Sequence, residues 1–347
     1  MSGYARATFG ALRDSGAEVL LVHEQAAADA PFDDDLLDLG LPGGTWAGAP
    51  DECGVLALVT DFAPHALLVS SWNPPQYRHV SLAMRGCTLR VLCMDNAWLG
   101  SAKQWGARAI ATRYVQPAYD VAFLPGERQA TFARMLGFPD DRILWGLYTC
   151  DHQAFTAARR AGGEDAPNSF LFAGRLVREK GVDVLAEAYR SYRGSTPDPW
   201  PLIVSGTGPL AKTLDSAPGV EMAGFVPPHE LPALFSRSGC LVLPSRFEPW
   251  GVVVHEATSA GLAVICSSAC GSSTRLVLDG YNGAVVRPGD PISLTEAMRW
   301  MSAPTTDRAE LARHSFELSH QFTPERWATY LIERIPPLRR SIGLAPV

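Results

Sequence analysis

Short apolar runs alternate with loops and longer amphipathic stretches along most of the 347-residue chain. In the first half these runs predict strands at residues 17–23, 55–60, 66–70, 89–94 and 121–124. In the second half they predict strands at residues 170–173, 202–205, 220–226, 240–243, 263–266 and 285–289. Because most runs lead into a loop or a helix, the pattern indicates parallel sheets of the α/β class.

The first helix is predicted from Gly3 to Ser15, ahead of the first strand, with Phe9 and Leu12 as core positions. A doubly wound α/β domain normally opens with a strand, a glycine-rich turn and then a helix of this kind. The order found here predicts that the first β-strand is missing. The natural start then lies upstream of Met1, or the chain is a truncated product.

A chain of this length accommodates two α/β domains. The stretch TAARRAGGEDAP, residues 156–167, is small and polar, and we interpret it as the linker between an N-terminal domain (1–155) and a C-terminal domain (168–323). The sequence Thr323-Pro324-Glu325 is a good helix start, so 324–347 is predicted to form a terminal helix whose aromatic residues precede Pro336.

Composition and charge exclude several classes of protein. Hydrophobic residues make up 47% and charged residues 19%, as in soluble globular proteins, and the net charge of -6 argues against nucleic-acid binding. The 7 cysteines form no CxxC pair and no His-spaced cluster, which predicts no zinc site and a reducing cytoplasm. No apolar run approaches the ~20 residues of a membrane span. The acidic run at 33–35 is interpreted as solvated surface.

The run at 240–243 leads into PSRFEPWGVVVHEA, where a helix is predicted to begin near Pro249 or Trp250. Glu248 then lies at the mouth of this helix, beside free amides, and Glu256 lies about two turns further on. A separation of roughly 10 Å is too long for a general acid/base pair acting on one bond. The two carboxylates are instead suited to bind separate hydroxyl-bearing parts of one long ligand.

This glutamate pair, within PSRFEPWGVVVHEATSAGLAVI, resembles the E-x7-E signature of retaining GT-B glycosyltransferases of family 4. The resemblance implies two Rossmann-like domains facing across a cleft, with the terminal helix returning to the first domain. It implies that Glu248 binds hydroxyls of the donor sugar and that Glu256 binds the ribose. It also implies that Arg175 and Lys180, in a stretch similar to the family's GRL…EKG, bind the donor diphosphate.

Further donor-binding residues follow from the same resemblance. They are Gly3, Gly174, Gly206, Gly208, Pro249, Trp250, Gly251 and Val252. The residues expected to take part in catalysis are Asp95, Glu248, Arg175 and Lys180. The resemblance implies no metal and no cofactor besides the nucleotide-diphospho-sugar donor.

The sequence departs from the family pattern at two places. Met94 stands where many members have a histidine near the reacting sugar, and only Asp95 matches that pair. Asp95 either positions an acceptor hydroxyl and stabilises positive charge at the sugar, or caps a turn. Arg275 occupies the place of a usual glutamate, which puts a donor contact from that loop in doubt.

The region 78–113 is basic and carries interleaved aromatic residues. Its charged residues are Arg78, Arg85, Arg90, Lys103, Arg108 and Arg113, against the single acid Asp95. One interpretation is a contact with anionic lipid or an anionic glycan, which would place a cytoplasmic protein at the inner face of the membrane. The alternative is a solvated helix face with buried aromatics.

The resemblance therefore implies transfer of a hexose-like sugar, with retention of configuration, from a UDP- or GDP-sugar to an acceptor hydroxyl. The acceptor is a glycan, a lipid-linked molecule or a small molecule. Two alternatives stay open. A nucleotide-sugar epimerase would need acid/base carboxylates in the first domain, where only Asp95 stands out. A non-catalytic binding protein fits Met94 and the missing first strand.

Overall fold

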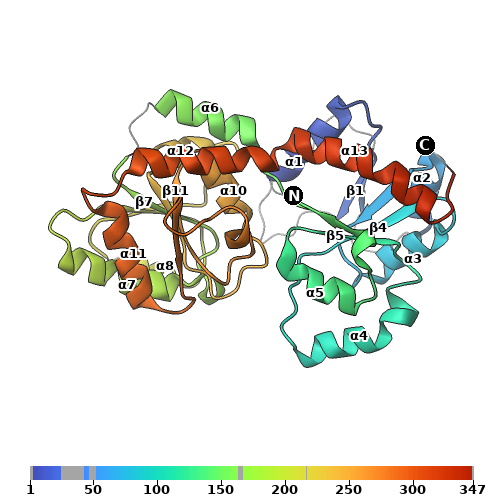
Figure 1. The fold of residues 1–347 in the computed structure, drawn as a ribbon, viewed down its shortest axis with the longest axis horizontal. Coiled ribbons are helices and arrows are strands. Elements are labelled where there is room, and N and C mark those ends of the chain that lie inside the picture. The colour runs from blue at the N-terminus through green and yellow to red at the C-terminus, as the bar shows by residue number, and fades with distance from the viewer. Residues whose placement is uncertain (1–2, 25–42, 47–51, 163–166, 216, 346–347) are drawn as a thin grey trace. The chain divides into compact units, whose positions relative to one another are not determined.

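The computed structural model describes residues 3–24, 43–46, 52–162, 167–215 and 217–345 (Figure 1). The chain divides into two compact units. The first unit comprises Met1–Tyr148 together with Pro324–Val347, and the second unit comprises Thr149–Thr323. Both contain parallel sheets with helices on their faces, so the predicted pair of α/β domains is confirmed. The terminal segment belongs to the first unit, as expected.

The first unit contains a parallel four-stranded sheet in the order β3-β4-β5-β6 and a separate parallel pair, β1-β2. Its strands are β1 (Leu21–Glu24), β2 (Gly43–Trp46), β3 (Ala66–Val69), β4 (Leu89–Cys93), β5 (Val121–Leu124) and β6 (Ile143–Trp145). Its helices are α1 (Gly3–Asp14), α2 (Glu52–Phe62), α3 (Pro75–Ala83), α4 (Ala102–Tyr114), α5 (Glu127–Met135) and α13 (Pro324–Ser341).

Helices α1 and α13 pack together over one face of the four-stranded sheet. Trp327 of α13 stacks on Phe123 of β5 with ring centroids 6.0 Å apart, and its other edge meets Phe9 of α1. Leu331 and Leu338 extend this core along α13. The predicted core position Phe9 is therefore in contact with the terminal helix.

One secondary-structure prediction in this unit is wrong. Residues 55–60 form part of helix α2 rather than a strand. Val55, Leu56 and Val59 fall on one helical face, and this face packs against Val80 and Met84. A continuous apolar run of five residues, 55–59, is compatible with either state, and its packing partner decides between them.

Helix α13 continues through Pro336 and Pro337. Its last turn is held from outside the helix. The buried Arg339 guanidinium donates to the His65 carbonyl at 2.6 Å and to the Ala345 carbonyl at 3.1 Å. These bonds stabilise the turn despite the helix hydrogen bonds that the prolines remove.

The second unit contains a parallel six-stranded sheet in the order β12-β11-β10-β7-β8-β9. The strands are β7 (Phe170–Ala173), β8 (Leu202–Ser205), β9 (Val220–Gly224), β10 (Cys240–Leu243), β11 (Ala263–Ser267) and β12 (Gly283–Val286). The helices are α6 (His152–Gly162), α7 (Val182–Ser195), α8 (Ala211–Asp215), α9 (Leu231–Ser236), α10 (Val252–Ser259), α11 (Pro291–Ser302) and α12 (Arg308–Ser319).

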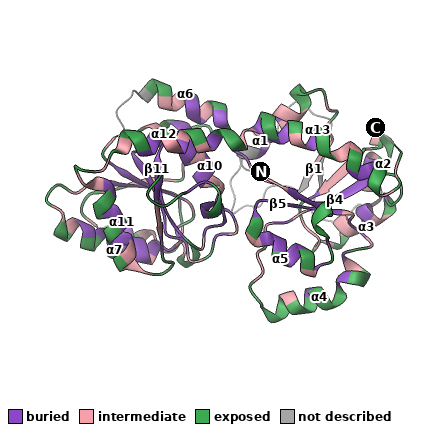
Figure 2. Cartoon of the chain, in the orientation of Figure 1, coloured by how far each residue is buried: buried purple, intermediate pink, exposed green. Residues whose placement is uncertain are grey.

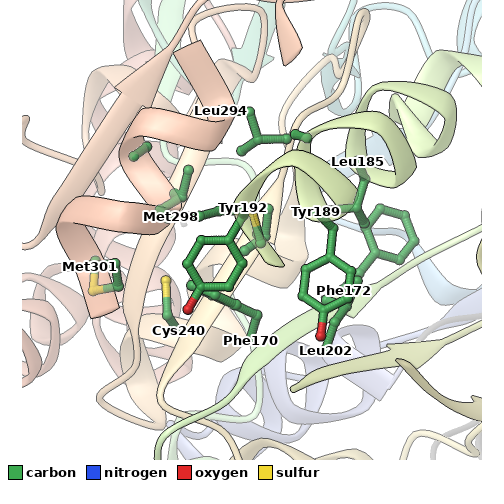
Figure 3. Close-up of a cluster of buried hydrophobic side chains, with 14 of the residues drawn as sticks. Phe170, Phe172, Leu185, Tyr189, Tyr192, Leu202, Cys240, Leu294, Met298 and Met301 are labelled. Atoms are coloured by element: carbon green, nitrogen blue, oxygen red, sulfur yellow. The ribbon is translucent and has the colours of Figure 1, made fainter. Parts of the chain in front are cut away.

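The strands of this sheet are largely buried (Figure 2), and apolar side chains cover both of its faces. On one face, Tyr189 and Tyr192 of α7 and Met298 of α11 pack against Phe170 and Phe172 of the central strand (Figure 3). On the other face, helices α6, α9 and α10 supply a second core. Both faces of the sheet are thus covered, as a fully parallel sheet requires.

The boundary between the units lies at Tyr148/Thr149, so the prediction of a linker at 156–167 is wrong for the described residues. Helix α6 occupies most of that stretch and packs on the second unit. Phe155 meets Phe235 at a centroid distance of 5.2 Å, and Arg159 donates to the Gly261 carbonyl at 2.8 Å. Because Phe155 and Arg159, one turn apart, both contact the second unit, helix α6 packs there despite the small, polar residues around them.

Candidate nucleotide-sugar site

The order of the six-stranded sheet defines where a ligand can bind. The chain runs outward from β7 through β8 to β9 and then returns to β10 on the other side of β7. The topological switch point therefore lies between β7 and β10. In open parallel sheets, ligands bind outside the carboxyl ends of the strands at such a point. The loops that follow β7 and β10 carry Lys180 and Glu248.

The structure joins these two predicted residues directly. The Lys180 Nζ forms a salt bridge with Glu248 Oε2. The side chains are 20% and 9% exposed, so the pair is largely shielded from water. Ser245 Oγ donates to the same carboxylate oxygen at 3.4 Å, and the Glu248 carbonyl accepts from the Gly271 amide at 3.1 Å. Glu248 is therefore held as a buried, paired carboxylate.

Backbone contacts lock the two loops together. The Glu179 carbonyl accepts from the amides of Arg246 and Phe247, at 2.8 and 3.2 Å. Gly181 is in the left-handed region (φ 70°), and a Cβ built there would lie 2.1 Å from the Pro244 carbonyl oxygen. The position of Lys180 relative to Glu248 thus depends on the main chain as well as on the ion pair.

The predicted glycines Gly174, Gly206 and Gly208 lie at the ends of β7 and β8. All three have positive φ, and a Cβ on Gly206 would lie 1.9 Å from the Gly174 carbonyl oxygen. A Cβ on Gly208 would lie 2.5 Å from the Leu176 carbonyl oxygen. The close packing of these two loops is sufficient to require glycine at 206 and 208, whatever ligand they approach.

Helix α10 begins at Val252, three residues later than Pro249, so the predicted helix start is wrong. Gly251 caps the helix in the left-handed conformation (φ 92°), which interrupts any continuation from Pro249 and Trp250. The amides of Val252 and Val253, in the first turn, have no partner inside the helix. Glu256 lies just over one turn into the helix, rather than two.

Trp250 is fixed by a residue that sequence reasoning missed. Its indole Nε1 donates to His255 Nε2 at 2.6 Å, and both side chains are 2% exposed. Burial lowers the pKa of His255 to about 3, so the ring is neutral and Nε2 is free to accept. Ser245 was also missed. The sequence signals that could have pointed to these contacts are the spacing of Ser245, three residues before Glu248, and of His255, five residues after Trp250.

Glu256 and Arg175 are more accessible to a ligand than the paired side chains of Lys180 and Glu248. Glu256 keeps part of its surface accessible, yet burial raises the pKa of its carboxyl to about 7. Arg175 is exposed, and no ion pair to it occurs among the described residues. Both groups are therefore available to a ligand, one as a poorly solvated carboxylate and the other as a solvated cation.

The raised pKa gives a prediction about stability. A glutamate ionises near pH 4.5 in the unfolded chain and near pH 7 in the fold, so the folded state binds the extra proton and stability falls as pH rises between these values. Glu256→Gln should therefore unfold about 2–5 °C higher than the wild type at pH 8. At pH 4.5 the two should coincide in differential scanning calorimetry. A difference in unfolding temperature that is the same at both pH values would contradict the raised pKa of Glu256.

The remaining predicted residues belong to the first unit. Asp95 follows β4, and its Oδ2 accepts a hydrogen bond from the Tyr148 hydroxyl at 3.1 Å. The Gln129 side-chain amide donates to the Asp95 carbonyl at 3.1 Å. Tyr148 was not predicted. Met94 is 4% exposed and serves as a core residue, and Gly3 is the first residue of α1.

Within the described ranges, no group of three or more His, Cys, Asp or Glu side chains is arranged to hold a metal ion. The acidic run at 33–35 lies outside those ranges. Among the helices that the structure describes, none is long and apolar enough to span a bilayer.

The two parallel α/β units and the site at the switch point define a protein of the GT-B fold. The chain is similar in structure to HepE from Anabaena in complex with UDP and glucose, with a TM-score of 0.75 and 16% identity over 95% of each chain. Sucrose-phosphate synthase from Thermosynechococcus elongatus also gives a TM-score of 0.75, at 17% identity, covering 97% of this chain and 93% of that chain.

Residues 155–316 match the family model Glycosyl transferases group 1. Alpha-D-kanosaminyltransferase from Streptomyces kanamyceticus is 29% identical over 190 residues, which are 50% of this chain and 48% of the relative. D-inositol 3-phosphate glycosyltransferase from Stackebrandtia nassauensis is 29% identical over 216 residues, which are 58% of this chain and 43% of the relative. The chain therefore spans about half the length of these relatives, or less. The residues that match the family model lie within the second unit, Thr149–Thr323.

Proposed function

We propose that this protein transfers a hexose-like sugar from a nucleotide-diphospho-sugar to an acceptor hydroxyl, with retention of the anomeric configuration and without a metal ion. The observation that carries the proposal is the Lys180–Glu248 pair at the switch point of the six-stranded sheet. The group 1 glycosyltransferase domain at 155–316 and the GT-B fold support it.

In this proposal the donor spans the loops after β7, β8 and β10. The sugar hydroxyls donate to Glu248, the diphosphate lies against Lys180, Arg175 and the first amides of α10, and the ribose hydroxyls donate to Glu256. In the free protein Lys180 neutralises Glu248. When the donor is bound, the Lys180 ammonium would contact both the Glu248 carboxylate and the diphosphate. The same lysine would then position Glu248 and stabilise the leaving diphosphate.

The chemical step balances without a covalent enzyme intermediate. The bond between the anomeric carbon and the diphosphate oxygen breaks as the acceptor oxygen bonds to the same carbon from the same face. The acceptor proton passes to the leaving phosphate oxygen. Asp95, held by the Tyr148 hydroxyl, is proposed to orient the acceptor hydroxyl.

Donor binding tests the first part of the proposal. UDP, GDP and their common sugar conjugates are added to the protein, and its unfolding temperature is measured. A matching nucleotide at about 100 times its Kd should raise this temperature by roughly 5–10 °C. The Arg175→Ala/Glu256→Ala double variant should lose this increase. No shift with any nucleotide would contradict the donor assignment.

The product distinguishes transfer from epimerisation. With donor and an acceptor glycan, lipid-linked acceptor or small-molecule acceptor, NMR of the product should show the anomeric configuration of the donor. An inverted product would overturn retention. A changed donor sugar released without an acceptor would instead indicate an epimerase.

A further inference from the structure

Helix α4 of the first unit carries apolar side chains that the fold leaves exposed. Trp105 and Ile110 on the helix are 50% and 49% exposed, and Leu99, in the segment just before it, is 63% exposed. Figure 2 shows most of α4 as exposed, and Figure 1 places it at the periphery of its unit. Large apolar groups gathered over one helix mark an interaction surface.

The side of α4 that faces the protein is narrow. Ala107 and Ala111 are buried, one turn apart, and the following Val115 continues the same stripe. Trp105, Ala109 and Thr112 lie on the opposite side and are exposed. At about 3.6 residues per turn, Trp105 and Ile110 lie about 140° apart around the helix, so the outward side is broad, and Gly106, Ala109 and Arg113 lie between them.

Cations surround this apolar side. Lys103, Arg108 and Arg113 are all exposed, and the sequence contains no acidic residue between Asp95 and Asp120. The Arg108 guanidinium lies 5.2 Å from the Trp105 ring. A local positive charge of this kind contrasts with the net charge of -6 for the whole chain.

The structure narrows the basic region predicted at 78–113. Arg90 is buried and forms a salt bridge with Asp120 at 2.6 Å, so it serves the core of the unit. Arg78 donates to the Tyr114 carbonyl at 3.0 Å and lies over the Tyr114 ring, which fixes the end of α4. Arg85 is exposed but follows α3, outside this helix. Leu99 and the outward side of α4 form the surface that we call the α4 face.

We propose that the α4 face docks on an anionic phospholipid surface. A tryptophan and two aliphatic side chains enter the boundary between headgroups and acyl chains, while Lys103, Arg108 and Arg113 remain at the level of the lipid phosphates. Charge complementarity favours this occupant, because the face presents cations and apolar groups with no carboxylate. The inference is independent of the proposed sugar transfer.

Vesicle flotation tests the proposal. The wild type should float with phosphatidylcholine vesicles that contain about 30% phosphatidylglycerol and should not float with phosphatidylcholine alone. Lys103→Gln/Arg108→Gln/Arg113→Gln should weaken the partition coefficient about 100-fold. Leu99→Ser/Trp105→Ser/Ile110→Ser should weaken it at least about 10-fold.

The matched control removes the same charge elsewhere. Arg190, Lys212 and Arg334 are exposed residues of α7, α8 and α13, and their triple glutamine variant should bind within about 3-fold of the wild type. The two glutamine variants alter exposed side chains, so their unfolding temperatures should match the wild type. Trp105 also packs on Trp98 with ring centroids 5.2 Å apart, so the unfolding temperature of the triple serine variant is measured and flotation is carried out below it.

Three results would overturn the proposal. The first is the absence of wild-type binding to the anionic vesicles. The second is equal loss of binding in the control and the α4 variants. The third is binding that depends on the cations but not on Leu99, Trp105 and Ile110, with equal retention on an anionic polysaccharide resin, which would assign the face to a glycan.

Discussion

Replacing Lys180 with methionine is expected to lower kcat/KM for the donor about 1000-fold. The change removes the ammonium that would stabilise the leaving diphosphate, and it leaves the buried Glu248 carboxylate without its partner. An unpaired buried charge of this kind costs about 3 kcal/mol of stability. Initial rates over a range of donor concentrations, with the unfolding temperature of the same sample, measure both effects.

The matched control is Arg178→Met. Arg178 lies in the same turn, Arg178–Lys180, but it is exposed. It should leave the rate within about 3-fold of the wild type, since exposed charges contribute little. Equal losses in the two variants would show that general positive charge, and not this lysine, matters.

A double variant separates the chemical role of Lys180 from its structural one. In Lys180→Met/Glu248→Gln the buried charge is gone, so much of the stability lost in Lys180→Met should return while activity stays low. If activity returned together with stability, the pair would be structural and the proposed donor contacts would be wrong.

The parallel sheets were predictable because their signal is local. The apolar runs at β7, β8, β10 and β11 are short and bounded by glycine or proline, and each coincides with a buried strand. The prediction of a strand at 55–60, within helix α2, was wrong because this apolar run is equally compatible with a strand and a helix. The domain boundary at Tyr148 was not predicted because the composition of residues 156–167 does not reveal how Phe155 and Arg159 pack.

The site was predictable only in part. The resemblance drew attention to Lys180 and Glu248, which are 68 positions apart in the sequence, but only the order of the strands brings them into contact. The supporting contacts of Ser245, His255 and Tyr148 depend on side-chain positions within the folded units. Such contacts leave no periodic pattern in the sequence. The sequence therefore indicates candidate residues such as Glu248 but not the side chains that contact them.

Gly181→Ala should have the second large effect. The new Cβ would lie 2.1 Å from the Pro244 carbonyl oxygen, and neither the backbone carbonyl nor the glycine conformation at φ 70° adapts cheaply. We expect a loss of about 2–4 kcal/mol in the free energy of unfolding, measured by urea titration. The loops would separate, so Lys180 would move away from Glu248 and sugar transfer would fall even in the folded fraction.

Gly280→Ala is the control that isolates the steric part of this effect. Gly280 has nearly the same φ, 74°, but nothing lies within 4 Å of its added Cβ. Its cost should therefore be that of the backbone conformation alone, about 1 kcal/mol. If the two variants lost equal stability, the contact with Pro244 would be unimportant. The two loops would then be held by the hydrogen bonds to the Glu179 carbonyl and by the ion pair, without a steric requirement for glycine at 181.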